Sequence, residues 1–365
     1  MINNNISSPI FLYDPQQPEL NKQLLEAIDE GNVRAIEQAL KEQADPNGVD
    51  SYNNPLLAYA ISAKNIDIVK LLIDHGAKSD AVDSYNNPLL AHAIYTKNID
   101  IVKLLIEHGA KSDAVDLDND PLLRAAIYTK NIDIVKLLIE HGAKPDAVDS
   151  AYNPLLAHAI STKNIDIVKL LIEHGAKPDA VDSDNDPLLT HAISTENIDI
   201  VKLLIEHGAK PGAVDSDNNP LLRAAISTEN VDIVKLLIEH GANPNAIDSK
   251  GNPILFYAIK INNLEVIKVL LEKGANPDTR NSNQQPAIAE AICNDDFELV
   301  ALLCKHGADT SITDRTGRTL YQLVEDEIQP TLTTEYEVQP YGLSVTIEEA
   351  IEGKGLRNQR IYSNN

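Results

Sequence analysis

Apolar and polar residues follow a pattern that returns every 33 residues through most of the chain. In the unit of residues 149–181, the stretch LLAHAI after Pro154 predicts a short first helix, because proline suits the N1 position of a helix. Asn164 opens a second helix, whose broad apolar face consists of Ile167, Val168, Leu170, Leu171 and Ile172. Gly175 supplies the left-handed residue that ends this helix. The polar, turn-rich residues before each proline predict a hairpin between units.

Two residue types mark the period. Proline recurs at Pro55, Pro88, Pro121, Pro154, Pro187, Pro220, Pro253 and Pro286, and glycine at Gly76, Gly109, Gly142, Gly175, Gly208, Gly241, Gly274 and Gly307. The phrase NIDIVKLLIEHGAK occurs unchanged at 98–111, 131–144, 164–177 and 197–210. In one interpretation, stacked repeats form identical interfaces and therefore require identical side chains. In the other, a recent duplication produced the identical copies. Both interpretations place the function outside the repeated phrase.

At these residues the chain resembles the ankyrin repeat. IVKLLIEHGA is similar to the second helix of that family, and the resemblance covers roughly residues 17–328. It implies an all-α repeat solenoid of stacked helix-turn-helix ankyrin repeats with β-hairpin or turn fingers. The family's T-P-L-H tetrapeptide, in which Thr and His bond each other, aligns here with Pro154, Leu155, Leu156 and Ala157. We expect this polar network to be missing and apolar packing to replace it.

The repeat register divides the chain into five parts. Residues 1–16 form an N-terminal segment, and residues 17–49 form a capping repeat with Gln43 where glycine is expected. Eight 33-residue repeats occupy 50–313, a C-terminal half-repeat cap occupies 314–328, and a tail occupies 329–365. Terminal repeats need a polar outer face, so atypical end repeats are expected.

Composition narrows the class of partner. Hydrophobic residues make up 43% and aromatic residues 4%, with no Trp, so the core is aliphatic. The net charge of −24 disfavours nucleic acid and favours a protein partner with a basic surface. Two cysteines make no disulfide framework, and neither a secretory signal peptide nor a membrane-inserting segment is recognisable. We therefore expect a cytoplasmic monomer.

Differences between repeats concentrate at the hairpins and along the first helix. By resemblance, these positions line the concave face where ankyrin arrays bind partners. Exposed tyrosine suits an interface because it brings a large area at low entropy cost, and Arg124 is placed to pair with nearby acids. The candidate partner-binding residues are Tyr52, Tyr85, Tyr95, Asp118, Asp120, Arg124, Tyr128, Tyr152, Asp184 and Asp186. In the alternative interpretation, the tyrosines only cover neighbouring hairpins and the acids only interact with solvent.

Motifs for other chemistry are incomplete. DLDNDP at Asp116 and DSDNDP at Asp182 begin like a calcium loop, but proline stands where glycine is needed and isoleucine where the last glutamate is needed. The histidine before seven of the eight terminal glycines fits a helix C-terminus, and copies about 10 Å apart cannot share a zinc ion. No phosphate-binding loop or serine elbow is present. We predict no enzyme activity, no cofactor and no metal site.

Two functional hypotheses remain. In the first, the array is a non-enzymatic scaffold that binds a protein through its concave face. In the second, the protein is a bacterial effector delivered into a host cell, its repeats act as the receptor for a host target, and its tail carries a type IV translocation signal. The second rests on a resemblance to ankyrin arrays of host-associated bacteria and on Glu348, Glu349 and Glu352 in the tail. A duplicated array without an evolved partner is also compatible with the sequence.

Overall fold

The computed structural model describes residues 17–294, 296–311, 313 and 316–317. The predicted N-terminal segment 1–16, the tail 329–365 and most of the half-repeat cap 314–328 lie outside the described residues. The chain forms two compact units, residues 1–177 and 178–365.

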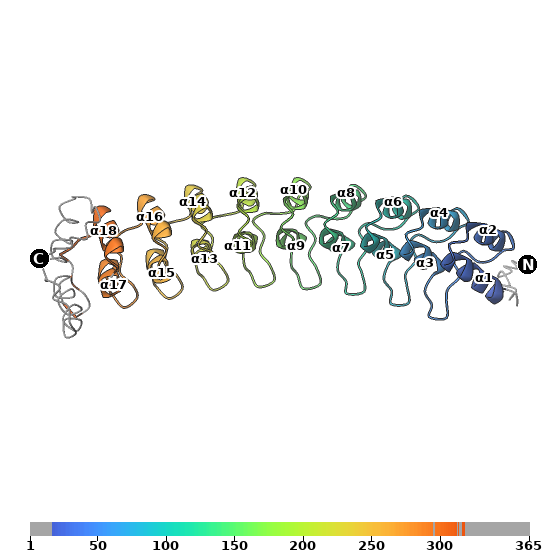
Figure 1. Cartoon of the computed structure of the whole chain (residues 1–365), viewed down its shortest axis with the longest axis horizontal. Coiled ribbons are helices and arrows are strands. Elements are labelled where there is room, and N and C mark those ends of the chain that lie inside the picture. Colours follow the sequence, from blue (N-terminus) through green and yellow to red (C-terminus); the bar gives the residue numbers. More distant parts are fainter. Residues whose placement is uncertain (1–16, 295, 312, 314–315, 318–365) are drawn as a thin grey trace, which may run out of the picture. The chain divides into compact units, whose positions relative to one another are not determined.

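Paired helices build the first unit. First helices α1, α3, α5, α7 and α9 pack in one row and second helices α2, α4, α6, α8 and α10 in another (Figure 1). Their bounds are α1 Gln17–Asp29, α2 Val33–Lys41, α3 Leu56–Ser62, α4 Ile66–Asp74, α5 Leu89–Thr96, α6 Ile99–Glu107, α7 Leu122–Thr129, α8 Ile132–Glu140, α9 Leu155–Ser161 and α10 Ile165–Glu173.

The second unit has the same construction over its described residues. Its helices are α11 Leu188–Ser194, α12 Ile198–Glu206, α13 Leu221–Ser227, α14 Val231–Glu239, α15 Ile254–Ile261, α16 Leu264–Glu272, α17 Ala287–Cys293 and α18 Phe297–Lys305. Odd-numbered helices pack on odd and even on even, as in the first unit. This arrangement confirms the predicted all-α repeat solenoid. Among the described residues of either unit, no helix is long and apolar enough to cross a bilayer.

The predicted helix ends are close to the observed ones. The Asn164 side chain accepts a hydrogen bond from the Ile167 N–H at 3.2 Å, which makes Asn164 the N-cap of α10. Gly175 follows the helix with φ of +102°, a conformation that only glycine adopts easily. Pro154 was expected at N1 but lies one residue earlier, at the N-cap, because its ψ of 139° is extended and it pairs with Val148.

Each predicted hairpin is reduced to one antiparallel β-bridge. In the first unit the bridges join Val49 to Pro55, Val82 to Pro88, Val115 to Pro121 and Val148 to Pro154. Proline lacks an N–H and cannot continue a ladder, so the pairing stops after one bridge. Backbone hydrogen bonds, such as the one from the Asp83 N–H to the Asn87 carbonyl at 2.9 Å, close each finger.

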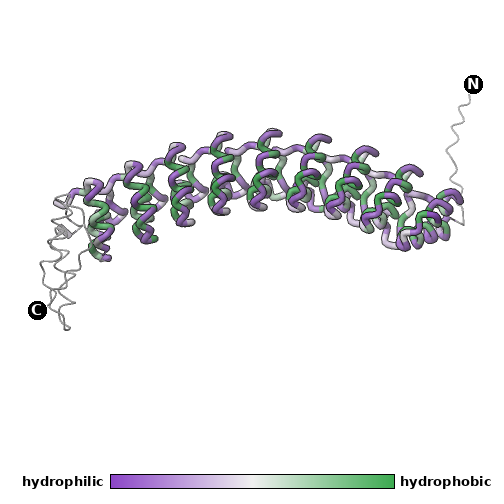
Figure 2. The backbone as a smooth tube through the Cα atoms, turned by 45° about the horizontal axis from the view of Figure 1, so that its top comes forward, coloured by the Kyte–Doolittle hydropathy of each residue, from purple (hydrophilic) through white to green (hydrophobic). Residues whose placement is uncertain are grey.

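The core is aliphatic, as the composition predicts. On α10, Ile167, Val168, Leu171 and Ile172 are buried and Leu170 is half-buried. Figure 2 shows hydrophobic and hydrophilic stretches alternating along the helices, as expected when each helix buries one face. Because most interfaces use nearly the same side chains, burial largely repeats with the sequence period.

Two buried serines break this regularity. The Ser79 and Ser112 hydroxyls are buried without a hydrogen-bond partner, and later repeats have proline at the same position, as at Pro145. We expect Ser79→Pro and Ser112→Pro each to raise the free energy of unfolding by about 0.4–1 kcal/mol, because proline restricts the unfolded chain. Urea unfolding measures the gain. Ser79→Ala, which removes only the unpaired hydroxyl, serves as the control, and a loss of stability in the proline variants would contradict the shared backbone geometry.

Candidate functional site

An aspartate at the start of each hairpin fixes the shape of the finger. Asp83 Oδ1 accepts hydrogen bonds from the N–H groups of Tyr85 at 2.8 Å and Asn87 at 2.9 Å. Asp149 repeats this turn with the N–H groups of Ala151 and Asn153. Such Asx turns use the short side chain to satisfy the local backbone. They leave the residue two positions after the aspartate at the tip of the finger.

A second polar position links one finger to the next. Asn54 Oδ1 accepts the N–H of Ser84, and Asn87 Oδ1 accepts the N–H of Leu117. Asp120 Oδ1 does the same with Ser150 at 2.7 Å. These side chains form a hydrogen-bonded ladder across the four fingers of the first unit. Both Asn and Asp occur at this position because either side chain supplies the required acceptor oxygen.

The expectation that apolar packing alone replaces the missing Thr–His network is wrong. Asp83 Oδ2 pairs with His92 Nε2 at 2.8 Å, and Asp149 Oδ2 pairs with His158 Nε2 at 2.8 Å. In the first repeat the Tyr59 hydroxyl donates to Asp50. Each bond ties a hairpin to the first helix that follows it. Sequence reasoning missed this network, although the nine-residue spacing from aspartate to His or Tyr is visible in the repeats.

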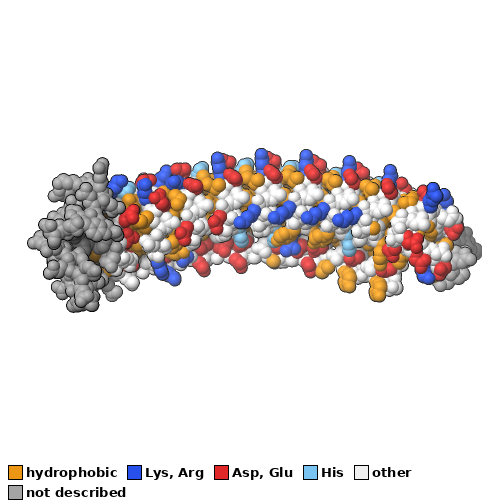
Figure 3. All heavy atoms as spheres, in the orientation of Figure 1, with side chains coloured by type: hydrophobic (Ala, Val, Ile, Leu, Met, Phe, Trp, Pro, Cys, Tyr) orange, Lys and Arg blue, Asp and Glu red, His pale blue; other side chains and the backbone are white. Residues whose placement is uncertain are grey.

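The predicted tyrosines lie mostly in solvent. Tyr52, Tyr85 and Tyr152 are 74–78% exposed on the fingers, and Tyr95 is exposed near the end of α5. Figure 3 shows hydrophobic side chains projecting from the hairpin edge towards the N-terminal end. The exposed aliphatic residues of the same four fingers are Val49, Val82, Val115, Leu117 and Val148. We call these five aliphatic residues together with Tyr52, Tyr85 and Tyr152 the finger surface.

Arg124 is half-buried and its contacts lie within the array, whereas Tyr128 beside it is 48% exposed. Arg124 Nη1 donates to Asp120 Oδ2 at 2.5 Å, and its Nε lies 3.8 Å from Asp149 Oδ2. Its guanidinium carbon lies 5.5 Å from the centre of the Tyr128 ring, whose hydroxyl meets His158 Nδ1 at 2.7 Å. The predicted pairing of Arg124 with an acid is confirmed. Asp120 is only 4% exposed, so a direct contact of Asp120 with a partner does not fit its burial.

The remaining acidic candidates separate into two kinds. Asp118 in the first unit and Asp184 in the second are exposed at finger tips. Asp186 is half-buried and accepts the N–H of Ser216 at 2.7 Å, so it belongs to the ladder of the second unit. Asp118 and Asp184 thus remain candidates for contact, whereas Asp120 and Asp186 hold fingers together.

Tyr152 has an unusual backbone conformation. Its φ is +66°, and the equivalent residues in the preceding repeats are Asn53, Asn86 and Asn119 at +61° to +65°. A left-handed conformation costs a bulky L-residue roughly 1–2 kcal/mol, and asparagine less. The aromatic ring is therefore retained at a local cost in stability.

We expect Tyr152→Asn to raise the free energy of unfolding by about 1 kcal/mol, since it removes that strain. Urea unfolding of the full chain measures the change. The double variant Ala151→Tyr, Tyr152→Asn recreates the sequence of the preceding DSYNNP fingers and should show the same gain. Equal stability of wild type and both variants would mean that the fold relieves the strain elsewhere.

The hairpin carboxylates have lowered pKa values. Burial alone would raise the pKa of Asp149, but hydrogen bonds from the Asn153 N–H, His158 and the Ala151 N–H outweigh it and lower the pKa. Asp83 and Asp182 show the same lowered pKa for the same reasons, with His92 and His191 as partners. A carboxylate whose folded pKa lies below its unfolded value stabilises the fold above the unfolded pKa. That stabilisation is lost as the pH falls through the folded pKa.

We therefore expect Asp149→Asn to lower the free energy of unfolding by about 1–3 kcal/mol at pH 7. An amide forms weaker hydrogen bonds with the turn and with His158 than a carboxylate does. The variant should lose less stability than wild type between roughly pH 5 and pH 2, where the wild-type carboxylate becomes protonated. Urea unfolding across this range measures both slopes. Exposed Asp118, changed to Asn, is the control, and identical slopes for Asp149→Asn and wild type would contradict the assignment.

The histidines at the ends of the second helices also have a structural role. Six of them, His75, His108, His141, His174, His207 and His240, donate Nδ1–H to the carbonyl four residues earlier in their own helix. Within the part of the chain that the structure describes, no group of three His, Cys, Asp or Glu side chains is arranged to hold a metal.

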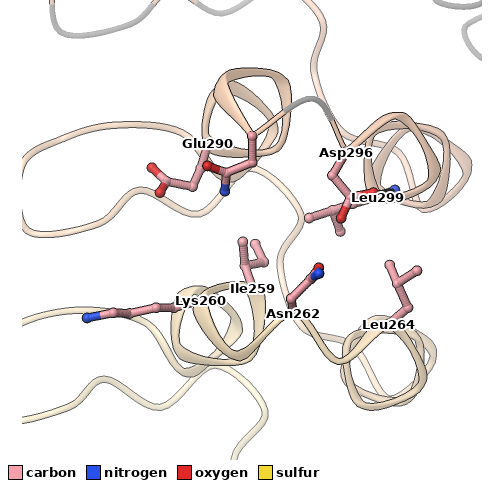
Figure 4. A pocket seen from close by; sticks show the side chains of 8 residues that line it. Ile259, Lys260, Asn262, Leu264, Glu290, Asp296 and Leu299 are labelled. Atoms are coloured by element: carbon pink, nitrogen blue, oxygen red, sulfur yellow. Dashed lines mark hydrogen bonds between the residues drawn. The ribbon is translucent and has the colours of Figure 1, made fainter.

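Both units contain a hollow among their described residues. In the second unit, a pocket of about 610 Å³ separates the pair α15 and α16 from the pair α17 and α18. Figure 4 shows Ile259 and Leu299 pointing into it, while Lys260 and Glu290 extend away from Leu299. Its polar groups therefore do not converge on one point. In the first unit, a smaller pocket of about 240 Å³ lies between the first two fingers of the repeats.

Comparison with known proteins agrees with this architecture. The family model described as ankyrin repeats in three copies matches residues 24–116, 111–182, 156–248, 188–281 and 221–314. No curated protein matches the chain. The matched segments together run from residue 24 to residue 314, well over half of the sequence. The chain therefore belongs to the ankyrin repeat family, whose repeats are generally protein–protein interaction modules.

Proposed function

We propose that the chain is a non-enzymatic scaffold that binds a protein partner through the finger surface and Tyr95 of the first unit. The observation that carries the proposal is the row of four fingers, tied side by side by the ladder, with Tyr52, Tyr85 and Tyr152 almost fully in solvent. Exposed apolar side chains grouped on neighbouring fingers are typical of interaction sites in soluble proteins. Exposed tyrosine also dominates many interface hot spots.

The electrostatics favour a basic partner. The net charge of −24 speeds the approach of positively charged proteins, and Asp118 lies at a finger tip beside the aromatic ones. The acidic fingers of the second unit, with Asp184 exposed, present the same sign of charge. A host protein with a basic surface fits this description. We propose that the scaffold acts as a monomer in the cytoplasm.

A crosslinking pull-down from host-cell and bacterial lysates tests the proposal. The bait is the full chain, and the comparison bait changes Tyr52, Tyr85, Tyr95 and Tyr128 to Ala. Since Tyr128 bonds His158, a third bait changes only the first three tyrosines and leaves that internal contact intact. A protein captured by wild type and lost with both variants supports the proposal. Equal capture by all three baits would move the interface away from the tyrosines.

Delivery into a host cell is a second candidate, supported by the acidic residues of the tail, Glu348, Glu349 and Glu352. Deleting residues 329–365 separates the two functions. Lost delivery with unchanged partner binding supports a translocation signal. Unchanged delivery of the truncated chain would remove the idea.

A further inference from the structure

The pocket of the first unit lies between two repeats. Asn54, Ala58, Tyr59 and Ser62 line it from one repeat, and Asp83, Tyr85 and His92 line it from the next. Its volume is about 240 Å³, and the highly exposed Tyr85 stands at its mouth. The question is which chemical group would fill it.

The chain itself contains a filled counterpart two repeats further on. Arg124 holds the repeat position of Ala58. Around it lie the residues that correspond to four other lining residues of the pocket. Asp120, Tyr128, Asp149 and His158 correspond in the repeat register to Asn54, Ser62, Asp83 and His92. There the guanidinium donates to Asp120, lies near Asp149 and faces the Tyr128 ring.

A second arginine occupies the same register position in the second unit. Arg223 lies with its guanidinium carbon 4.7 Å from the centre of the Tyr257 ring, and Tyr257 is the equivalent of His92. Both arginines are followed by alanine, at Ala125 and Ala224, where the pocket repeat has Tyr59. The inter-repeat site of this array thus takes a guanidinium twice, each time against an aromatic ring.

The pocket retains one carboxylate of the arginine site and has aromatic rings of its own. Asp83 holds the same carboxylate–imidazole pair as Asp149, with His92 at 2.8 Å, and a carboxylate oxygen can accept more than one hydrogen bond. Tyr59 and Tyr85 add aromatic faces, on which arginine stacks better than lysine. Two contacts of Arg124 are absent here: Asn54 stands where Asp120 supplies a second carboxylate, and Ser62 stands where Tyr128 supplies its ring.

From this internal comparison, and resting on the proposed protein-binding function, we propose that the pocket between the first two fingers receives an arginine side chain of the partner. Ala58 leaves open the space that Arg124 fills from within its own repeat. The partner's guanidinium enters beside Tyr85 and lies against Asp83 and the tyrosine rings. The finger surface then contacts the residues that flank this arginine.

Peptide titration of the full chain tests the pocket apart from any partner. The probes are acetyl-Gly-Gly-Arg-Gly-Gly-amide and the same peptide with citrulline, which keeps the shape but lacks the charge, or with lysine. NMR of ring-labelled histidine follows His92. We expect the arginine peptide to shift the His92 signal in a saturable way and to bind at least about 10-fold more tightly than the citrulline peptide. Equal shifts with all three peptides, or no shift with arginine, would overturn the proposal.

Three variants sharpen the test. Ala58→Arg gives the pocket an internal occupant and should abolish the His92 response. Asn54→Asp restores the second carboxylate and should tighten arginine binding by about 3- to 10-fold. Ala91→Arg places the same substitution one repeat later and should leave the response intact. If Asn54→Asp leaves the affinity unchanged, the pocket is not a guanidinium site, whether or not Ala58→Arg folds.

The two proposals fail in distinguishable ways. If partner capture depends on Tyr52 and Tyr95 but the arginine peptide gives no response, the scaffold function is supported and the arginine pocket is refuted. A saturable arginine response with tyrosine-independent capture would do the opposite.

Discussion

Changing Tyr52, Tyr85 and Tyr95 together to Ala is expected to weaken partner binding by at least about 100-fold, since hot-spot aromatics contribute 2 kcal/mol or more each and do not add fully. The rings are exposed, so their loss leaves the core unchanged. Calorimetric titration of the captured partner measures the affinity. Urea unfolding of the same variant should match wild type within about 0.5 kcal/mol, as for other surface substitutions.

The matched control lies on a finger of the second unit. Lys250 holds the register position of Tyr52 and Tyr85, and Lys250→Ala should leave the affinity within about threefold of wild type, as expected for a residue away from a hot spot. A triple tyrosine variant that binds as well as Lys250→Ala would show that the aromatic fingers do not carry the interface.

The second large effect concerns the repeated phrase. Leu105 on α6 and Leu138 on α8 are completely buried in equivalent positions. Leu105→Ala and Leu138→Ala are each expected to destabilise the fold by about 3–4 kcal/mol, because each leaves a cavity in an aliphatic core. Urea unfolding with its slope measures the loss and shows whether the array unfolds in one transition.

The two losses should also agree to within about 0.5 kcal/mol, because stability in a repeat array sums over nearest-neighbour contacts and these neighbours are nearly identical in sequence. Ile132→Ala, at the exposed start of α8, is the control and should cost much less. Unequal costs for Leu105 and Leu138 would mean that the identical phrases do not serve as equivalent scaffold.

Much of the fold follows from the sequence because local signals and the repeat period agree. Asn164 as N-cap and Gly175 after the helix are consequences of local backbone chemistry that recur in every copy. The position of Pro154 differs by one residue, since a proline without an N–H fits N1 and N-cap alike until its ψ is known. Residues 1–16, 318–365 and thus the predicted tail lie outside what the structure describes.

The candidate site was only partly predictable. Positions that differ between repeats are expected to lie on the surface. Asn54 and Asp120 differ in residue type, yet both supply the same acceptor oxygen in the ladder. Sequence variation alone does not distinguish a contact residue from a structural position that tolerates two residue types. The exposed tyrosines remain predictions of binding, because exposure shows availability and not occupancy.

The pocket inference shows what internal repetition adds. Repeats with Tyr or His nine residues after the hairpin aspartate have Ala, Thr or Phe just before it, whereas Ala125 and Ala224 follow Arg124 and Arg223. The sequence shows that arginine replaces the usual residue at this position in two repeats. Only the distances around Arg124 show that the arginine fills a site between repeats. One repeat thus serves as a chemical reference for another.

The most direct measurement is site-specific photocrosslinking of the full chain with its captured partner. A photoreactive phenylalanine replaces Tyr85 at a finger tip or Lys136, which is exposed on second helix α8. We expect a strong adduct from position 85 and little or none from position 136. An adduct from position 136 with none from position 85 would contradict binding through the finger surface.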